Sequence, residues 1–325
     1  MHPLDKKVLG STGLAVTRLG LGCSSLGRLT GDTADEDAAR VVHQALSLGV
    51  NLFDTAPLYG VGTSEERLGK ALQGVGRDRY VLATKVGRLL KPTEDGRRQV
   101  VFDFSYDGVM RSFEDSLRRL GVDRIDVLHI HDADRHYDDA IVGAYPALAK
   151  LRSQGAIRGV SAGMNQWEML ARFAREGAFD CFLLAGRYSL LEQDSLDEFL
   201  PLCMEKDIGI MAGGTYNSGI LAKGAESGTY NYREPPPEIA EKARALEAVA
   251  VRHRVDLRAA ASQFVLAHPA ITSIIPSTRR PERVKENFEL ISVKIPADFW
   301  AELKAEGLVR DKAPTPSEVA DRKEG

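Results

Sequence analysis

The chain lacks the features that mark several classes of protein. It has three cysteines in 325 residues, Cys23, Cys181 and Cys203, and they are scattered without the short spacing that zinc sites use. We therefore expect reduced, buried thiols and neither disulfides nor a metal centre. No apolar run is long enough to span a bilayer, and the N-terminal segment MHPLDKKVLGSTG has no apolar signal-peptide core. These absences favour a cytoplasmic protein with no membrane partner.

An excess of positive charge is also missing. The 43 Lys and Arg residues against 46 Asp and Glu residues give a net charge of −3, so there is no electrostatic reason to bind nucleic acid. We expect a small-molecule substrate and a monomer or homodimer. No Gly/Ser-rich or Pro-rich linker divides the middle of the chain. The sequence thus predicts one domain over residues 1–311 and a polar, mobile tail over residues 312–325.

Short apolar runs alternate with amphipathic stretches along the chain. Strands are predicted at 18–23, 50–55, 79–86, 125–131, 157–163, 181–186, 208–213 and 272–277. Helices are predicted at 34–48, 64–73, 106–119, 139–154, 166–175, 194–205, 238–253, 256–267 and 280–290. The strands are continuous apolar runs, which is typical of parallel strands covered on both faces. Eight such units predict an α/β protein with a (β/α)8 TIM barrel.

Three further segments complete this prediction. An N-terminal β-hairpin is expected over 6–17, and long loops over 87–105 and 217–237 are expected on the C-terminal rim of the barrel. A doubly wound sheet is the alternative fold. It would need a strand followed by a glycine fingerprint, and the nearest match, GLGCSSLG, has the wrong spacing.

Four ionisable side chains lie at or just after the ends of predicted strands. Asp54, Lys85 and His131 end the second, third and fourth strands, and Tyr59 follows the second. Such positions face the active site of a barrel. An ammonium beside a carboxylate stays charged and favours the phenolate, so we expect a lowered pKa for Tyr59. Tyr59 would then be a general acid–base for exchange between an alcohol and a carbonyl, with a neutral His131 orienting the substrate oxygen.

Each of these residues alone has an ordinary structural explanation, and one pair also fits another chemistry. His129 and His131 share one face of a strand, and a His-x-His pair at a barrel strand end can hold zinc. Zinc sites need three or four protein or water ligands, whereas the remaining histidines fall in helices, a loop or the terminus. We therefore favour a site without metal and a nicotinamide cofactor.

The segment SIIPSTRRPERVKEN, residues 273–287, predicts a second part of the site. A strand ends at Pro276, hydroxyl side chains follow, and a helix begins near Pro281. A helix N-terminus suits phosphate, and the arginines at 279, 280 and 283 would pair a phosphate or stack on adenine. The alternative is a solvated basic helix face. The NSG turn at 217–219 would let the backbone approach a pyrophosphate closely.

These segments resemble the aldo-keto reductase superfamily over about residues 7–310. The matching segments are DTAPLYG with SEERLGKAL, LATKVG, SLRRLGVDRIDVLHIHD and IIPSTRRPERVKEN. The resemblance implies a barrel that binds NAD(P)H extended, without a Rossmann fold. It also implies a tetrad of Asp54, Tyr59, Lys85 and His131, with Tyr59 as the proton donor or acceptor.

Finer segments resemble the branch of D-threo-aldose (L-fucose) 1-dehydrogenases, L-galactose dehydrogenases and a pyridoxal 4-dehydrogenase. They are VVFDFSYDGVMRSFEDSLRRLG, GVSAGMNQWEML, LLAGRYSLLEQ and NSGILAKG. The branch implies oxidation of an aldose of L-fucose, L-galactose or D-arabinose type at C1 to the lactone. One alternative is reduction of a bulky ketone, aldehyde or xenobiotic carbonyl, with Tyr216, Tyr230 and Tyr232 lining a broad pocket. Another is a regulatory subunit that senses the cofactor.

The residue patterns and the resemblance together predict a set of cofactor-binding residues. They are Gly22, Cys23, Asn165, Arg187, Asn217, Ser218, Gly219, Leu221, Ser277, Thr278, Arg279, Arg283, Glu286 and Asn287. The usual Ser-Asn pair for the nicotinamide amide aligns with Gly163 and Met164, the usual Gln with Ala185, and the usual stacking Tyr with Gly213. We expect Asn165 and Arg187 to take over part of this holding role.

The cofactor preference depends on one further departure from the family pattern. The Lys that usually pairs the 2′-phosphate of NADP aligns with Ser277. Its loss favours NAD over NADP, although Arg279 and Arg283 would still serve NADP.

Overall fold

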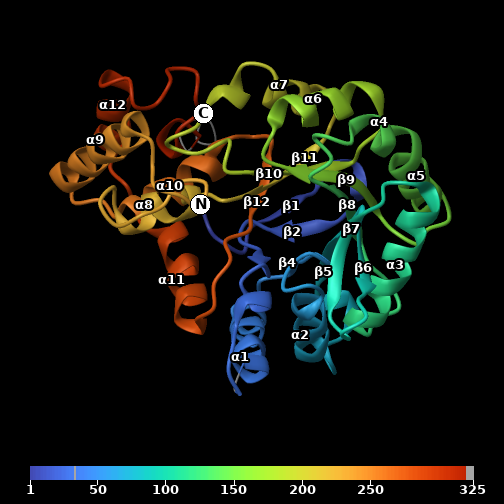
Figure 1. Ribbon diagram of the computed structural model, residues 1–325. Helices are drawn as coiled ribbons and strands as arrows, with labels where there is room; N and C mark the ends of the chain where they lie inside the picture. Colours follow the sequence, from blue (N-terminus) through green and yellow to red (C-terminus); the bar gives the residue numbers. More distant parts are fainter. Residues whose placement is uncertain (33, 320–325) are drawn as a thin grey trace.

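The computed structural model describes residues 1–32 and 34–319, and its centre is one eight-stranded parallel sheet (Figure 1). In order around the sheet the strands are β3 (Leu21–Gly22), β4 (Leu52–Asp54), β5 (Val81–Val86), β8 (Val127–His131), β9 (Gly159–Met164), β10 (Cys181–Ala185), β11 (Gly209–Gly213) and β12 (Ile271–Ile274). Parallel bridges from Leu19 to Ile274 and from Gly22 to Ser277 join the first strand to the last. The sheet is therefore a closed barrel, as the alternation of apolar runs predicts.

Helices surround this barrel (Figure 1). They are α1 (Ala34–Ser47), α2 (Thr63–Leu72), α3 (Tyr106–Leu120), α4 (Tyr137–Asp139), α5 (Tyr145–Ser153), α6 (Trp167–Glu176), α7 (Phe199–Glu205), α8 (Ile220–Lys223), α9 (Pro237–His253), α10 (Leu257–Ala267), α11 (Pro281–Ser292) and α12 (Ala297–Ala305). None of the described helices combines the length and the apolar character that crossing a bilayer requires.

The N-terminal hairpin closes one end of the barrel. Strands β1 (Lys6–Val8) and β2 (Ala15–Thr17) pair antiparallel, and Leu9 and Val16 join the cluster of apolar side chains inside the barrel. A Cβ atom on Gly10 would meet the Asp180 carbonyl oxygen at 2.0 Å, and Gly10 has φ +51°. This close approach requires glycine, and it seats the hairpin so that a ligand must enter from the opposite rim.

The segments outside the barrel depart most from the sequence prediction. The expected loop at 87–105 contains an antiparallel hairpin of β6 (Arg88–Pro92) and β7 (Arg98–Phe102), because two strand-forming runs flank the turn residues TEDG. Residues 194–205 form a short 3-10 turn followed by α7. Helix α12 was not predicted.

Part of the predicted tail packs on the domain. Ala313 and Thr315 are buried, and the Lys304 ammonium lies 2.6 Å from a Glu318 carboxylate oxygen. The domain boundary at 311 stays a prediction. The rest of the predicted mobile tail, residues 320–325, lies outside the described residues.

Candidate active site

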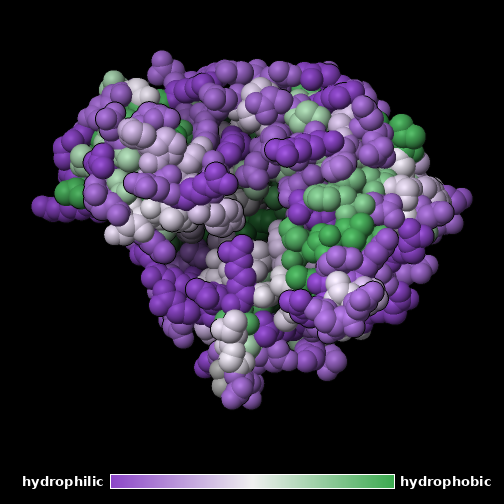
Figure 2. Space-filling view, in the orientation of Figure 1, coloured by the Kyte–Doolittle hydropathy of each residue, from purple (hydrophilic) through white to green (hydrophobic). Residues whose placement is uncertain are grey.

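A cavity of about 960 Å³ opens where the barrel strands end. Figure 2 shows the surface hollowed at the centre of this face. Most of the predicted site residues line the cavity: Gly22, Cys23, Asp54, Tyr59, Lys85, His131, Asn165, Arg187, Asn217, Ser218, Gly219 and Ser277. The other predicted residues are not part of this lining: Leu221, Thr278, Arg279, Arg283, Glu286 and Asn287. The sequence prediction therefore located the cavity, and the assignment of the remaining residues to cofactor binding stays a prediction.

A buried ion pair lies on the inner face of β4 and β5. Lys85 Nζ donates to Asp54 Oδ1 at 2.6 Å and to the Thr55 carbonyl oxygen at 2.8 Å, and both charged side chains are almost fully buried. Burial by itself would raise the pKa of the Asp54 carboxyl, but the Lys85 charge and His129 outweigh it and hold that pKa below its ordinary value. Burial likewise opposes the charge on Lys85, but Asp54 and Tyr59 raise the Lys85 pKa. Both partners are thus ionised.

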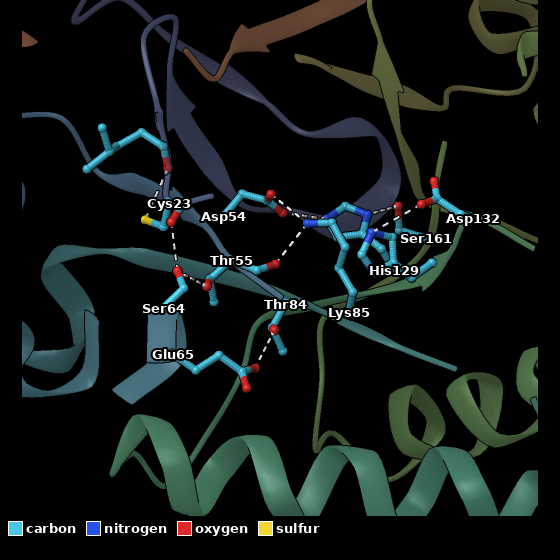
Figure 3. Close-up of polar contacts among 12 residues, drawn as sticks. Cys23, Asp54, Thr55, Ser64, Glu65, Thr84, Lys85, His129, Asp132 and Ser161 are labelled. Atoms are coloured by element: carbon cyan, nitrogen blue, oxygen red, sulfur yellow. Dashed lines mark hydrogen bonds and ion pairs between the residues drawn. The ribbon is translucent and has the colours of Figure 1, made fainter. Parts of the chain in front are cut away.

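Tyr59 is held beside this pair by a close contact of backbones. A Cβ atom on Gly60 would meet the Gly27 carbonyl oxygen at 2.4 Å, and Gly60 has φ +62°, so only glycine fits there. The turn places the Tyr59 ring with its centroid 5.1 Å from Lys85 Nζ. The His131 ring lies edge-on to Tyr59 with centroids 6.0 Å apart. The structure therefore brings the four predicted side chains together at one wall of the cavity (Figure 3 shows the Asp54–Lys85 part).

The pKa of Tyr59 departs from the expectation, whereas the pKa of His131 agrees with it. Burial raises the pKa of Tyr59 above its ordinary value, although Lys85 acts in the opposite direction. The expected lowering of the Tyr59 pKa is therefore wrong for this structure, because desolvation of the phenolate outweighs the nearby ammonium. Burial, together with the charges of Lys85 and Arg88, holds the His131 pKa well below its ordinary value. His131 is neutral, as an imidazole that orients an oxygen needs to be.

A second histidine contacts the ion pair, and the sequence analysis considered it only as a metal ligand. His129 Nε2 lies 3.3 Å from Asp54 Oδ2, and His129 Nδ1 lies 2.6 Å from Ser161 Oγ (Figure 3). Neither Nε2 nor Asp54 Oδ2 has a hydrogen-bond partner with full geometry among the described residues. Parallel pairing aligns His129 with Lys85 and Ser161. The sequence signal that could have identified His129 is its position two residues before His131, on the same face of the strand.

The opposite wall of the cavity carries amides and glycines. Asn165 Nδ2 donates to the Ala185 carbonyl oxygen at 2.6 Å, and Asn217 Nδ2 donates to the Gly186 carbonyl oxygen at 3.0 Å. Arg187 Nη2 donates to Asn231 Oδ1 at 3.3 Å. Asn217 Oδ1 and Thr215 Oγ1 are buried without a hydrogen-bond partner among the described residues. Both residues line the cavity, and buried polar atoms without a partner are uncommon in folded proteins.

The predicted phosphate segment is only partly engaged with the cavity. Ser277 Oγ donates to Ser25 Oγ at 2.8 Å and accepts from the Ser25 backbone N–H at 2.9 Å. Arg283 forms an ion pair with Glu286, and Asn287 accepts a hydrogen bond from Tyr216, which lines the cavity. Glu286 and Asn287 thus have structural partners within the helical layer.

The three tyrosines that were considered for a broad pocket take different places. Tyr216 and Tyr232 line the cavity, whereas Tyr230 does not and its hydroxyl donates to Glu192. Within residues 1–32 and 34–319, no group of three or more His, Cys, Asp and Glu side chains has the arrangement of a metal site.

Comparison with known proteins finds matches along nearly the whole chain. A family model described as the aldo/keto reductase family matches residues 18–306. A pyridoxal 4-dehydrogenase of Microbacterium luteolum is 40% identical, with 94% of this chain and 98% of that protein covered. A D-threo-aldose 1-dehydrogenase of a Pseudomonas species is 38% identical, covering 94% and 97%. The solved holo form of an aldo-keto reductase from Bacillus halodurans superposes with a TM-score of 0.78 at 26% identity, covering 97% and 99% of the two chains.

Proposed function

Since the chain belongs to the aldo/keto reductase family, we propose that it oxidises the C1 hydroxyl of an aldose to the lactone with NAD. The family makes it an NAD(P)-dependent oxidoreductase. The sugar substrate rests on the likeness to the Pseudomonas aldose dehydrogenase over almost the full length of both chains. The observation that carries the chemistry is the gathering of Asp54, Tyr59, Lys85 and His131 at one wall of the cavity.

The opposite wall fits a nicotinamide dinucleotide. The buried, unpartnered atoms Asn217 Oδ1 and Thr215 Oγ1 suit the polar groups of such a ligand, and the Asn165 side chain lines the same wall. Gly186 and Gly214, with φ +67° and +63°, leave the backbone uncovered there. When bound, the oxidised nicotinamide supplies the hydride acceptor and a positive charge that lowers the pKa of a nearby phenol.

We assign NAD as the preferred dinucleotide because of Ser277. This neutral side chain is hydrogen-bonded to Ser25, and it stands where the family usually has a lysine for the 2′-phosphate. Arg283 is paired with Glu286, which reduces its attraction for a phosphate.

The tetrad side chains then divide the proton chemistry. Tyr59 Oη accepts the proton of the C1 hydroxyl as the C1–O bond becomes double, and in the reverse direction it returns that proton. The Lys85 ammonium stabilises the phenolate, and the buried Asp54 carboxylate keeps Lys85 charged. The neutral His131 orients the reacting oxygen against Tyr59.

The test is the initial rate of nicotinamide reduction at mildly alkaline pH, with NAD and NADP supplied separately. The substrates are L-fucose, L-galactose, D-arabinose and pyridoxal. We expect rapid turnover of a sugar with NAD. Turnover of pyridoxal alone would replace the sugar by the second candidate, which the Microbacterium relative favours. Turnover of none of them, with cofactor binding intact, would reject both and favour reduction of a bulkier carbonyl.

A further inference from the structure

One carboxylate in the cavity lies next to the tetrad but does not belong to it. Asp132 follows His131 at the end of β8 and lines the cavity. Its backbone has φ +44°, a left-handed conformation that is uncommon outside glycine and that Asp and Asn tolerate best. The backbone N–H of Asp132 donates to the Gly163 carbonyl oxygen at 3.0 Å. This turn brings Asp132 Oδ2 to 3.6 Å from His131 Nε2 (Figure 3 labels Asp132).

An arginine on the extra hairpin fixes one oxygen of this carboxylate. Arg88 Nη2, on β6, donates to Asp132 Oδ2 at 2.6 Å. The guanidinium carbon lies 5.0 Å from the centroid of the Phe102 ring on β7, and the Arg88 side chain is only 14% exposed. Arg88 is not part of the cavity lining, whereas Asp132 is. The hairpin thus holds the Asp132 carboxylate from the side away from the cavity. A ligand in the cavity would contact Asp132 and not Arg88.

The second oxygen of Asp132 remains available to a ligand. Oδ1 accepts no hydrogen bond from the part of the chain that the structure describes, and the side chain is 34% exposed. Burial raises the pKa of the Asp132 carboxyl, while Arg88 and Lys85 act in the opposite direction. An oxygen of an arginine-bound carboxylate is a strong acceptor for a hydroxyl group.

The charges around Asp132 determine which kind of hydrogen-bond donor its second oxygen binds. Arg88 already neutralises Asp132, and Lys85 lies in the same cavity wall. Because Asp132 and Asp54 are each already paired with one of these cations, a further ammonium or metal cation would gain little net attraction. A neutral hydroxyl gains a charge-assisted hydrogen bond.

We propose that Asp132, held by Arg88, binds a hydroxyl group on the carbon next to the reacting carbon and so selects α-hydroxy aldehydes and aldoses. The position follows from the proposed function, on which this inference rests, because Tyr59 and His131 hold the reacting oxygen. Asp132 adjoins His131, so the substituent nearest to Asp132 is the one on the neighbouring carbon. Asp132 is therefore a specificity residue, and Arg88 is the residue that positions it.

The experiment compares two aldehydes that differ by this hydroxyl alone. Reduction of lactaldehyde and of propanal is measured with NADH and with NADPH, and kcat/KM is expressed per free aldehyde. We expect wild-type protein to prefer lactaldehyde by about tenfold or more, the size of one charge-assisted hydrogen bond to a half-buried acceptor. In Asp132→Gly the ratio of the two kcat/KM values should fall below about threefold, because the KM for lactaldehyde rises more than the KM for propanal.

The variants are chosen to keep the left-handed turn, and because both aldehydes are compared in the same protein, an unfolded fraction lowers both rates alike and leaves their ratio unchanged. Glycine adopts φ +44° without strain, and Asp132→Asn keeps both the shape and the left-handed turn while it removes the charge. The Asp132→Asn variant is expected to prefer lactaldehyde by a factor between those of wild type and Asp132→Gly. The control is Asp134→Asn, which removes the same charge two residues away at a position outside the cavity lining, and it should keep the wild-type preference.

The outcomes separate this inference from the proposed function. Preference for lactaldehyde that disappears in Asp132→Gly supports the hydroxyl site, even if no sugar is oxidised and the aldose assignment fails. Oxidation of a sugar by a wild-type protein that treats lactaldehyde and propanal alike would overturn the hydroxyl site alone. A preference that persists in Asp132→Gly, or turnover of neither aldehyde, would also overturn it.

Discussion

Two buried ion pairs lie on opposite faces of strand β5, and their surroundings differ. On the inner face, Lys85 contacts Asp54 and lines the cavity. On the outer face, Thr84 Oγ1 donates to Glu65 Oε1 at 2.6 Å, and Arg119 Nε donates to Glu65 Oε2 at 2.6 Å (Figure 3 shows the Thr84–Glu65 contact). Both oxygens of the outer carboxylate therefore have partners from β5 and α3. The inner carboxylate has a full partner on Oδ1 only.

The comparison shows that a buried charge does not by itself indicate function. Glu65 is completely buried, yet it joins α2 to β5 and α3 as a structural contact. The inner pair lines a cavity where buried atoms such as His131 Nδ1, Thr215 Oγ1 and Asn217 Oδ1 have no hydrogen-bond partner among the described residues. Such atoms are rare in folded proteins, and their concentration around one pair marks the place where a ligand acts.

The largest effect is expected on the inner face, at Tyr59. Tyr59→Phe removes the only proposed proton acceptor, so kcat should fall by roughly 10²–10⁴-fold, the usual contribution of a general acid–base group. Cofactor affinity should stay unchanged, because the ring remains in place beside His131. Steady-state kinetics and a titration of cofactor binding measure the two quantities. A variant that retains a tenth or more of the wild-type rate would contradict the assigned role.

The outer pair should show the opposite pattern. Glu65→Gln leaves Arg119, whose side chain is only 12% exposed, without its charge partner. Breaking a buried pair on one side costs about 3–5 kcal/mol of the free energy of unfolding, which urea denaturation measures. The kcat of the folded protein should stay within about twofold of wild type, since no atom of Glu65 lines the cavity. A large loss of kcat with an unchanged unfolding midpoint would erase the distinction between the faces.

The barrel and most of the site were predictable because both depend on periodicity along single strands. Continuous apolar runs identify buried parallel strands, and the C-terminal ends of such strands meet at one rim. Asp54, Lys85 and His131 end three of these runs, so their gathering follows from position alone. Tyr59 follows the first of these runs, and both its residue type and the resemblance to a family predicted its role.

What the sequence did not predict depends on contacts between distant elements. Ser277 is bonded to Ser25, which is 252 positions away, and Arg88 reaches Asp132 from an unrecognised hairpin. Residue types on one strand do not report which side chain faces them from another. The direction of the Tyr59 pKa shift was missed for a related reason, since the degree of burial that dominates it is a property of the assembled cavity.

A smaller effect on the inner face is expected at His129. Its Nε2 lies 3.3 Å from Asp54 Oδ2 and is the nearest partner of that oxygen. His129→Leu should lower kcat by about tenfold, because a buried acceptor left without a donor costs about 1–3 kcal/mol and Asp54 would reorient. KM should change less than kcat, since Lys85 remains bonded to Asp54. His129→Gln, which restores a donor, should recover part of the loss, and an equal loss in both variants would contradict this positioning role.

The smallest effect is expected for Asp132→Asn, which should shift the pH dependence of the oxidation and reduction rates. This shift distinguishes the inner face of β5 from the outer face without changing the fold. Burial raises the pKa of Tyr59 above its ordinary value, and the negative charges of Asp54 and Asp132 act in the same direction. Removing one of these charges by Asp132→Asn lowers the Tyr59 pKa. Oxidation needs the phenolate, so its rate rises with pH up to this pKa, and the rise should move to lower pH. Reduction needs the phenol, so the fall of its rate at high pH should move in the same direction.

The control for this shift is again the outer pair. Glu65→Gln removes a charge of the same sign from the other face of β5, and Glu65 is not among the charges that set the Tyr59 pKa. Its pH profile of kcat/KM should therefore coincide with that of wild type. An equal displacement in both variants would mean that Tyr59 responds to the overall charge of the protein, and a displacement to higher pH in Asp132→Asn would contradict the sign of the Asp132 contribution. A displacement in Asp132→Asn alone would show that its titration is set inside the cavity.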